Sequence, residues 1–471
     1  MRAENEIVNE NKLQIQMINT QADHKLKRIA KIATLGGLLF GFDTGVINGA
    51  IDYMAAPKEL NLSPANEGLV TSSVTLGAAF GAIISGHLSD KAGRKRLILA
   101  LSVIFFVGTL GCALSPNVTS IILFRILVGL GVGGASVVVP TYLSEISTTE
   151  LRGQMVTQNE LMIVGGQLLA FVINALLGTF VHVPHIWRYM LGFGMIPATA
   201  LFIGMQFAPE SPRWLVMMGK DSVARRILSK IRRKRSDGER EIQTIHSIMK
   251  LNNKKTKPLK ELKKPWIRRL VLIGAGLGIM EQFMGINIMM YYGTTILTNA
   301  GFTKSASLIA NIGNGLVAVI VTIIGMRLIN KVSRRKYMLM GIIGTTASLV
   351  ALVTMTKILS KTLLPFGVIL CLMAFLAFYQ GAVAPLVWVL LSEIFPQNIR
   401  GFGMGLATFF LWMSNFIVGY IFPIMISGLG IGKTFLVFAA FNVVAWAFAY
   451  KCVPETQGLT LEQIQRKFIT R

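Results

Sequence analysis

Four ionisable residues lie inside long apolar stretches of this 471-residue chain: Asp43, Arg125, Glu160 and Glu281. An ionisable side chain at the centre of a membrane-spanning helix costs about 2.5–3.5 kcal/mol on insertion scales. Each of the four therefore needs a partner, water or a function. Acidic side chains in such places can bind a proton or accept hydrogen bonds from hydroxyl groups.

Uncharged polar side chains accompany the acidic ones at helical spacing. Glu160 and Gln167 are seven residues apart, which is two turns, so they lie on one face of a helix. The segment EQFMGINIMMYY at 281–292 forms a polar ladder, and Trp388 shares a face with Gly381. Amides and phenols suit a neutral polyol because each hydroxyl both donates and accepts. An indole face can pack against the C–H face of a ring.

The composition argues against several other kinds of chemistry. The three cysteines each lie in or beside an apolar run, which rules out a disulfide scaffold. They form no CxxC motif or His/Cys cluster, which argues against a structural zinc site. We find no nucleophile–base pair, metal constellation or phosphate-binding loop, so we expect no enzyme, no catalytic residue, no metal and no cofactor. Apolar residues make up 53 % and charged residues 15 %, so the net charge of +25 does not indicate a nucleic-acid binder.

The helices that position these residues must cross a membrane. A spanning helix needs about 20 mostly apolar residues. The chain contains twelve such stretches, at about 32–51, 68–88, 97–115, 119–143, 155–179, 187–208, 270–292, 305–329, 337–357, 364–391, 402–426 and 432–452. In the first stretch Gly37, Gly41, Gly45 and Gly49 recur every fourth residue. That stripe predicts a surface for close helix packing rather than a ligand site.

The loop charges predict the orientation. Basic residues gather after every second span, above all in 209–269, which holds nineteen Lys or Arg and six Asp or Glu. Because cytoplasmic loops are rich in Lys and Arg, we expect both termini in the cytoplasm. The predicted domains are a cytoplasmic N-terminal segment 1–30, a six-helix bundle 31–208, a cytoplasmic helical linker 209–269, a second six-helix bundle 270–452 and a cytoplasmic tail 453–471.

The second half of the chain repeats the first. The matching segments are GHLSDKAGRKR at 86–96 with MRLINKVSRRK at 326–336, SEISTTELRG at 144–153 with SEIFPQNIRG at 392–401, and PESPRWL at 209–215 with PETQGLTLE at 454–462. Their near-constant offset predicts two six-span halves that arose by duplication. The predicted fold is therefore an all-α polytopic membrane protein of two pseudo-symmetric bundles, with a substrate site between them near the middle of the bilayer.

The motifs, in this order along the chain, resemble the sugar porter family of the major facilitator superfamily. They run from about Gly36 to Glu462 and are GFDTG at 41–45, GHLSDKAGRKR at 86–96, RILVGLGVGG at 125–134, PTYLSEISTTELRG at 140–153, PESPRWL at 209–215, EQFMGINIMMYY at 281–292, WVLLSEIFPQNIRG at 388–401 and PETQGLTLEQ at 454–463. Within that family, QNELMIVGGQLLAF at 158–171 looks most like bacterial myo-inositol–proton symporters.

The resemblance implies a proton-coupling pair. In proton-coupled sugar porters the residue matching Asp43 carries the proton and pairs with the arginine matching Arg125, whereas uniporters often carry Asn at the first position. Such a pair can switch between protonated and ionised forms, because burial disfavours the charged carboxylate and a nearby guanidinium favours it. The alternative is a static ion pair that ties two helices together.

The resemblance also implies a set of substrate contacts. The positions that match sugar-facing residues are Glu160, Gln167, Glu281, Gln282, Asn287, Tyr292, Trp388, Trp412 and Asn415. The family usually has Gln where this chain has Glu160 and Glu281. Either carboxyl could bind a hydroxyl, Glu160 could be a second proton site, and Glu281 could admit a cation or an amine. Trp412 could instead fill the core, and Tyr292 could be an interfacial tyrosine.

Charged residues at span ends match family positions that form ion pairs and latch the two halves on the cytoplasmic side in one conformation. These gating candidates are Asp90, Arg94, Glu145, Arg152, Glu393 and Arg400. In the second half Asn330 and Ser333 stand where the family has Asp and Gly, so the latch could be weaker there. The alternative is that all these charges are simple topology signals.

The function that we expect is import of a neutral polyol or sugar by proton symport across the cytoplasmic (inner) membrane. The substrate expected first is myo-inositol, the other partners are the proton and the lipid bilayer, and the protein is expected to be a monomer. Three alternatives stay open: a proton symporter for a hexose or pentose, a facilitative uniporter, and a membrane sensor that binds sugar without moving it.

Overall fold

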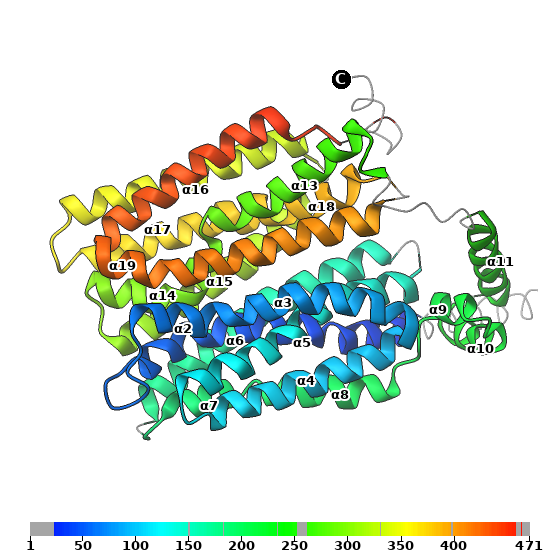
Figure 1. Ribbon diagram of the computed structural model, residues 1–471, viewed down its shortest axis with the longest axis horizontal. Coiled ribbons are helices and arrows are strands. Elements are labelled where there is room, and N and C mark those ends of the chain that lie inside the picture. Colours follow the sequence, from blue (N-terminus) through cyan, green and yellow to red (C-terminus); the bar gives the residue numbers. More distant parts are fainter. Residues whose placement is uncertain are drawn as a thin grey trace, which may run out of the picture.

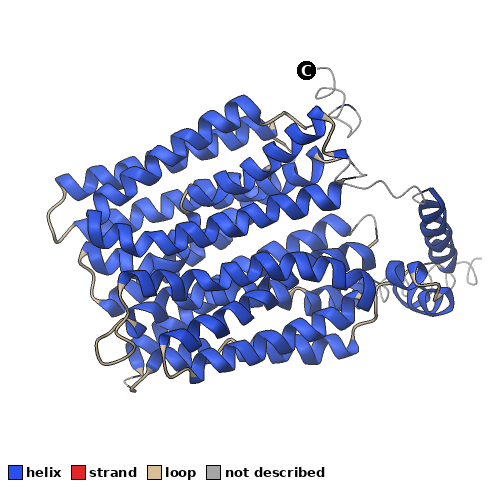
Figure 2. Ribbon diagram, viewed as in Figure 1, coloured by secondary structure: helices blue, strands red, loops and turns tan. Residues whose placement is uncertain are grey.

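The computed structural model describes residues 23–148, 151–181, 183–232, 234–251, 261–329, 331–396, 399–457 and 463. Within these ranges the regular structure is helical, and Figure 2 shows no strand among them. Helices satisfy their backbone hydrogen bonds internally, which a chain crossing lipid requires. The expected all-α fold is confirmed.

The first half of the chain forms one helical bundle. A helix that begins at Asp23 leads into α2 (Leu35–Met54). The bundle continues with α3 (Pro64–Ala92), α4 (Arg94–Leu114), α5 (Val118–Ile146), α6 (Arg152–Phe180), α7 (Ile186–Gly192) and α8 (Met195–Phe207). The first span thus starts before the predicted position 32. The prediction began too late because basic residues such as Lys25 and Lys31 interrupt the apolar pattern, although the helix is continuous through them.

The linker and the second half are helical too. The predicted linker contains α9 (Pro212–Met217), α10 (Asp221–Ile231) and α11 (Arg235–Leu251). The second bundle contains α13 (Pro265–Phe283), α14 (Ile286–Ala300), α15 (Lys304–Leu328), α16 (Arg334–Ile358), α17 (Leu364–Phe378), the π-helix η1 (Tyr379–Val383), α18 (Ala384–Ile394) and α19 (Arg400–Cys452).

Eleven helices in the described part of the chain are long and apolar enough to cross a membrane. The last of them, α19, has 53 residues, and Gly430 inside it has φ 74° and ψ 170°, which are not helical angles. A straight helix of that length would measure about 80 Å, more than twice the roughly 30 Å hydrocarbon core. α19 therefore comprises two spans that meet at Gly430, and the predicted twelve spans are present.

Figure 1 shows the two halves side by side, with α9, α10 and α11 beyond one end of the bundles. We call this end the linker end and the opposite one the far end. The halves meet where α3 packs on α19, α6 on α15 and α2 on α14. These helix pairs bring together residues that lie more than 100 positions apart in the sequence.

The glycine stripe of the first span is a packing surface, as predicted. A Cβ built on Gly41 of α2 would lie 1.8 Å from the carbonyl oxygen of Ile163 in α6. At Gly45 it would lie 2.8 Å from the carbonyl oxygen of Gln167. The stripe thus lets α2 approach the backbone of α6 closely, which places Asp43 of α2 and Gln167 of α6 on adjoining helices.

Three spans are interrupted, which the sequence analysis did not predict. The sixth divides between α7 and α8. The seventh breaks between Phe283 and Ile286, where Gly285 has φ 99°. The tenth passes through η1. A broken span leaves some backbone N–H and C=O groups without helical hydrogen bonds and changes the direction of its side chains. In transporters such breaks line binding sites. The breaks in spans seven and ten lie beside Glu281, Asn287 and Trp388.

We predict that Gly41→Ala destabilises the protein by about 1–3 kcal/mol, because the added methyl group overlaps the α6 backbone and forces the helices apart. Gly165→Ala in α6 is the matched control, since a Cβ there has no atom within 4 Å. Thermal unfolding in detergent should show a lower Tm for the first variant alone. Equal melting temperatures would contradict this packing.

Candidate functional site

Asp43 and Arg125 form a buried ion pair between α2 and α5. Arg125 Nη1 donates to Asp43 Oδ1 at 3.1 Å. Asp43 is 7 % exposed and Arg125 is 1 % exposed. Arg125 also donates from Nε to the carbonyl of Val70 at 3.0 Å and from Nη2 to the carbonyl of Thr71 at 3.3 Å, both in α3. The guanidinium thus connects the carboxyl group to the backbone of a third helix.

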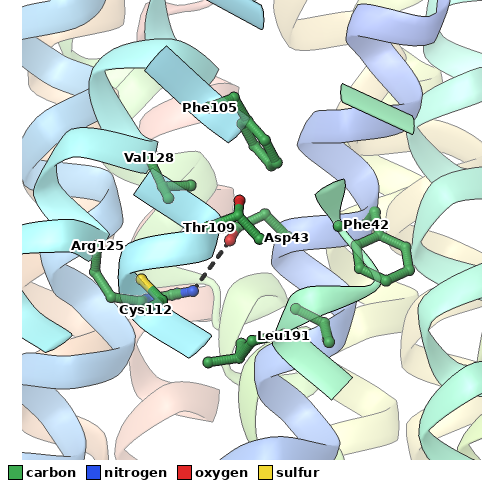
Figure 3. A pocket seen from close by; sticks show the side chains of 10 residues that line it. Phe42, Asp43, Phe105, Thr109, Cys112, Arg125, Val128 and Leu191 are labelled. Atoms are coloured by element: carbon green, nitrogen blue, oxygen red, sulfur yellow. Dashed lines mark hydrogen bonds and ion pairs between the residues drawn. The ribbon is translucent and has the colours of Figure 1, made fainter. Parts of the chain in front are cut away.

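A small cavity lies beside this pair. Its lining residues are Phe42, Asp43, Val46, Phe105, Thr109, Cys112, Arg125, Val128, Leu191 and Gly194, all from the first half. Figure 3 shows the Asp43 carboxylate and the Arg125 guanidinium pointing toward one another among these side chains. The cavity volume of about 10 Å³ is room for roughly one water molecule. The acidic group therefore sits at an internal pocket of the first bundle.

The residues predicted to contact substrate lie on other helices. Glu160 and Gln167 are on α6, Glu281 and Gln282 on α13, Asn287 and Tyr292 on α14, Trp388 on α18, and Trp412 and Asn415 on α19. None of these side chains lines the small cavity beside Asp43. The small cavity thus contains the predicted proton pair and none of the predicted substrate contacts.

The buried polar atoms without a hydrogen-bond partner among the described residues include five on helices α6, α13, α15 and α19. They are Gln167 Oε1, Glu281 Oε2, Asn314 Oδ1, Asn415 Oδ1 and Trp412 Nε1. Leaving such an atom unpaired costs about 1–3 kcal/mol. Four of the five atoms are acceptors and one is a donor, so the set suits a ligand that brings several hydroxyl donors. Four of these residues were predicted from the sequence.

Contacts across the halves bring part of this set together. A Cβ built on Gly315 of α15 would lie 3.2 Å from the Cα of Leu168 in α6. These two residues are the chain neighbours of Asn314 and Gln167, so both amide side chains belong to the same helix crossing. The two halves therefore both contribute to one polar region.

The two predicted tryptophans differ in environment. Trp388 follows the π-helix η1 and is 36 % exposed, which leaves its ring accessible. Trp412 is 3 % exposed, and its ring centroid lies 5.5 Å from that of Phe40 in α2. Trp412 thus packs between the halves while its indole nitrogen stays unpaired.

The polar ladder of the seventh span is partly engaged with the protein itself. Asn287 Nδ2 donates to Gln282 Oε1 at 2.5 Å across the break. The hydroxyl of Tyr292 donates to the carbonyl of Gly419 at 2.9 Å, and the ring is 1 % exposed. In this conformation Tyr292 contacts protein, so its assignment to the substrate stays a prediction.

A network at the far end joins the halves, and the sequence analysis missed it. Asn48 Nδ2 donates to the carbonyl of Met290 at 2.7 Å, and Asn48 Oδ1 accepts from the backbone N–H and the hydroxyl of Thr294 at 2.9 and 2.6 Å. Thr295 Oγ1 donates to Asp52 Oδ1 at 2.6 Å. Asn48 and Asp52 continue the helix of Asp43, which could have drawn attention to them. These bonds tie α2 to α14 at this end.

The predicted gating charges pair at the linker end, but within each half. Arg94 donates to Asp90 at 2.9 Å and to Glu145 at 3.1 Å, all in the first half. Arg334 pairs with Glu393 in the second half. The expectation that these pairs latch the two halves together is therefore not met in this conformation.

Three further gating positions complete this picture. Arg400 Nε donates to the carbonyl of Phe395 at 3.4 Å, which is also inside one half. The side chain of Arg152 and the whole of Asn330 lie outside the described residues.

The duplicated segments occupy equivalent places in the two halves. Glu210 accepts from the backbone N–H groups of Arg94 and Lys95 at 3.0 Å each, at the start of α4. Glu455 accepts from the N–H groups of Arg334 and Arg335 at 3.2 Å each, at the start of α16. A carboxylate at a helix N-terminus stabilises that end. The sequence repeat contained both acids, but the sequence analysis gave them no role.

Glu455 also accepts a hydrogen bond from the Ser333 hydroxyl, so the serine that replaces the family's glycine has a partner. Partial burial raises the pKa of Glu455, but the hydrogen bonds from Ser333 and from backbone amides outweigh it and hold that pKa below its ordinary value.

One family model and two relatives match nearly the whole length of this chain. The family model described as "Sugar (and other) transporter" matches residues 29–468. The "Putative metabolite transport protein YncC" of Bacillus subtilis is 50 % identical over 96 % of this chain and 97 % of its own length. The "Major myo-inositol transporter IolT" of the same organism is 49 % identical over 94 % of each chain.

Solved structures share the fold. The inward open conformation of the xylose transporter XylE from E. coli aligns with a TM-score of 0.81 at 28 % identity, covering 94 % of this chain and 99 % of that one. The proton:xylose symporter XylE bound to 6-bromo-6-deoxy-D-glucose aligns with a TM-score of 0.75 at 29 % identity, with the same coverage.

We predict that Arg125→Ala destabilises the protein by about 3–5 kcal/mol, because it leaves the buried Asp43 carboxylate without a partner. Adding Asp43→Asn should recover much of that loss, which a double-mutant cycle of thermal unfolding in detergent would measure. If the double variant is no more stable than Arg125→Ala alone, the pair is not the interaction that the structure shows.

We also predict a pH-dependent role for Glu455. A carboxyl with a lowered pKa in the folded state contributes stability above its unfolded pKa and loses it as the pH falls through the folded value. Glu455→Gln should therefore lower the Tm at pH 7, and the gap to the wild type should narrow below about pH 4. A gap that is constant from pH 7 to pH 3.5 would contradict the assignment.

Proposed function

This chain belongs to the sugar (and other) transporter family, the sugar porters of the major facilitator superfamily, and on that premise we propose that it imports myo-inositol by proton symport across the cytoplasmic membrane. The neutral polyol binds between the two halves, and Asp43 carries the proton. The halves then rock about the site so that it opens to one side of the membrane at a time.

The observation that carries the proposal is the set of unpaired polar atoms between the halves. Gln167, Glu281, Asn314 and Asn415 each offer a buried acceptor, and Trp412 offers a donor. myo-Inositol carries a hydroxyl on every ring carbon, so it can donate to several acceptors at once. The exposed face of Trp388 can pack on its C–H face.

The choice of myo-inositol over other polyols has independent support. A relative named as the major myo-inositol transporter is 49 % identical over 94 % of both chains. The carboxyl groups of Glu160 and Glu281 add strong acceptors at positions where the family usually has amides. Both features favour a substrate with hydroxyls all around its ring.

Proton coupling runs through Arg125. When Asp43 is ionised, its charge holds the guanidinium, which also donates to the carbonyls of Val70 and Thr71 in α3. Protonation removes that charge and weakens the pair. Because α3 packs on α19 of the other half, a change in how Arg125 holds α3 reaches the boundary between the halves.

The conformation fits one step of such a cycle. At the far end, Asn48 and Asp52 tie α2 to the second half. Nearer the linker end, Glu160 and Trp388 are exposed. The basic linker marks the cytoplasmic side by the positive-inside rule. The site is then closed to the outside and open to the cytoplasm, ready to release substrate and proton.

Coupling makes accumulation possible. One charge that moves through 100 mV yields about 2.3 kcal/mol. At about 1.4 kcal/mol per tenfold change, that supports a roughly fiftyfold concentration ratio. A pH gradient adds to it.

The second candidate is a proton symporter for a pentose or hexose. It is favoured by the XylE structures and by a relative from Levilactobacillus brevis named as a D-xylose transporter, which is 39 % identical over 92 % of this chain and 93 % of its own. Reconstituted vesicles should take up labelled myo-inositol saturably and faster than any hexose or pentose. Saturable uptake of a hexose without any inositol uptake would favour the second candidate.

We predict that Asp43→Asn abolishes uphill accumulation but retains exchange. The amide keeps the size of the side chain and cannot release a proton, so the halves can still rock around a bound polyol. The measurement compares active uptake with counterflow in the same vesicles, with Gly165→Ala as a control that keeps both. Uphill accumulation by the Asp43→Asn variant would exclude Asp43 as the proton carrier.

A further inference from the structure

The break in the seventh span packs against the second span of α19. α13 ends at Phe283, α14 begins at Ile286, and Gly285 between them has φ 99°. A Cβ built on Gly285 would lie 3.3 Å from Cδ1 of Phe438 in α19. The ring centroid of Phe283 lies 5.1 Å from that of Phe441 in the same helix. The break is thus a packed part of the second bundle.

Asn442, one turn after Phe438 on α19, bonds a carbonyl group that the break leaves without a helical partner. In an unbroken helix the carbonyl of Met284 would accept from the N–H of Ile288. Among the described residues no backbone N–H donates to it, and Asn442 Nδ2 does so at 3.0 Å. The second hydrogen of that nitrogen can serve the carbonyl of Phe438, 2.8 Å away. Asn442 is fully buried, so water does not compete for these bonds.

A hydroxyl group on a further helix orients the Asn442 amide. Thr345 of α16 is also fully buried, and its Oγ1 lies 2.8 Å from Asn442 Oδ1. The same hydroxyl lies 2.9 Å from the carbonyl oxygen of Ile342, so its single hydrogen serves one of the two acceptors at a time. Because carbonyl groups surround the amide nitrogen and a hydroxyl faces the amide oxygen, the Asn442 side chain has one favourable orientation.

The break brings together two of the predicted substrate contacts. Asn287 Nδ2 on α14 donates to Gln282 Oε1 on α13 at 2.5 Å. In an unbroken helix, residues five positions apart point about 140° apart around the axis, so these two side chains would diverge. Their contact therefore depends on the break at Gly285, and Asn442 stabilises that break from the opposite side of the span.

We propose that Asn442 is a positioning residue for polyol binding: its bond to the Met284 carbonyl keeps the seventh span broken. The break in turn aims Gln282 and Asn287 at one substrate. When Asn442 is removed, the N–H of Ile288 can pair with that carbonyl, and the helix then continues through the break. This inference rests on the proposed function, since it takes Gln282 and Asn287 as contacts of the polyol.

The experiment measures KM and the maximal rate of labelled myo-inositol uptake by reconstituted vesicles. Asn442→Leu keeps the approximate size of the side chain and removes its hydrogen-bond donors. A site that binds only while the span is broken loses apparent affinity in proportion to the unbroken fraction. KM should rise about five- to tenfold, which corresponds to the net value of one hydrogen bond. The maximal rate should change by less than about twofold, because saturating polyol restores the broken span.

Two further variants test the same break. Gly285→Ala should also raise KM, since a residue with a Cβ disfavours the positive φ at this position and favours a continuous helix. Thr345→Val should raise KM less than Asn442→Leu does, because it removes only the group that orients the amide. Thr346→Val is the matched control on α16: its hydroxyl donates to the carbonyl of Ile342 within the same helix, and its KM should stay at the wild-type value.

The outcomes separate this inference from the proposed function. A wild-type KM for Asn442→Leu, with or without a lower Tm, overturns the inference, because Asn442 would then only stabilise the fold. If Asn442→Leu does not fold, equal KM values for Thr345→Val and Thr346→Val overturn it. A wild type that takes up no myo-inositol overturns the proposed function instead. The same variants are then compared with labelled D-xylose, for which the inference predicts the same rise in KM.

Discussion

The ion pair between Asp43 and Arg125 is the constraint on which the rest of the molecule depends. Its charges are buried in the first bundle, where an isolated charge would cost several kcal/mol. The pair is stable because the guanidinium also donates to carbonyls of α3. Because Arg125 contacts both Asp43 and α3, a change in the charge of the Asp43 carboxyl group also changes how α5 and α2 hold α3. If Asp43 carries the proton, as we propose, its protonation is in this way connected to the surface where the bundles meet.

The substrate region follows from a different constraint, the satisfaction of buried polar groups. Spans seven and ten break beside Glu281, Asn287 and Trp388, and the polar atoms left unpaired lie on helices of both halves. A polyol that fills these acceptors would draw the halves together, because each half supplies only part of its partners. The far-end network around Asn48 plays the same role at one end without any ligand. In the proposed cycle, the balance between these two sets of bonds decides which end is open.

Much of the fold and part of the site could be predicted from the sequence. Hydropathy identified all twelve spans, and the stripe around Gly41 identified a helix contact, because both depend on local pattern. The resemblance predicted Gln167, Glu281, Trp412 and Asn415 as substrate contacts. Each of these residues has a buried polar atom without a hydrogen-bond partner among the described residues. The helix breaks could not be predicted, since Gly285 resembles any other glycine of a membrane helix. The gating pairs were expected between the halves, but such pairs depend on the conformation, which no sequence pattern records.

The central claim is that polyol and proton move together through one molecule. The most direct measurement uses vesicles that contain a pH-sensitive dye, with equal pH and no membrane potential at the start. Addition of the transported polyol outside should acidify the interior at a rate that follows polyol uptake. Saturable uptake of the polyol with no change of internal pH would contradict the account.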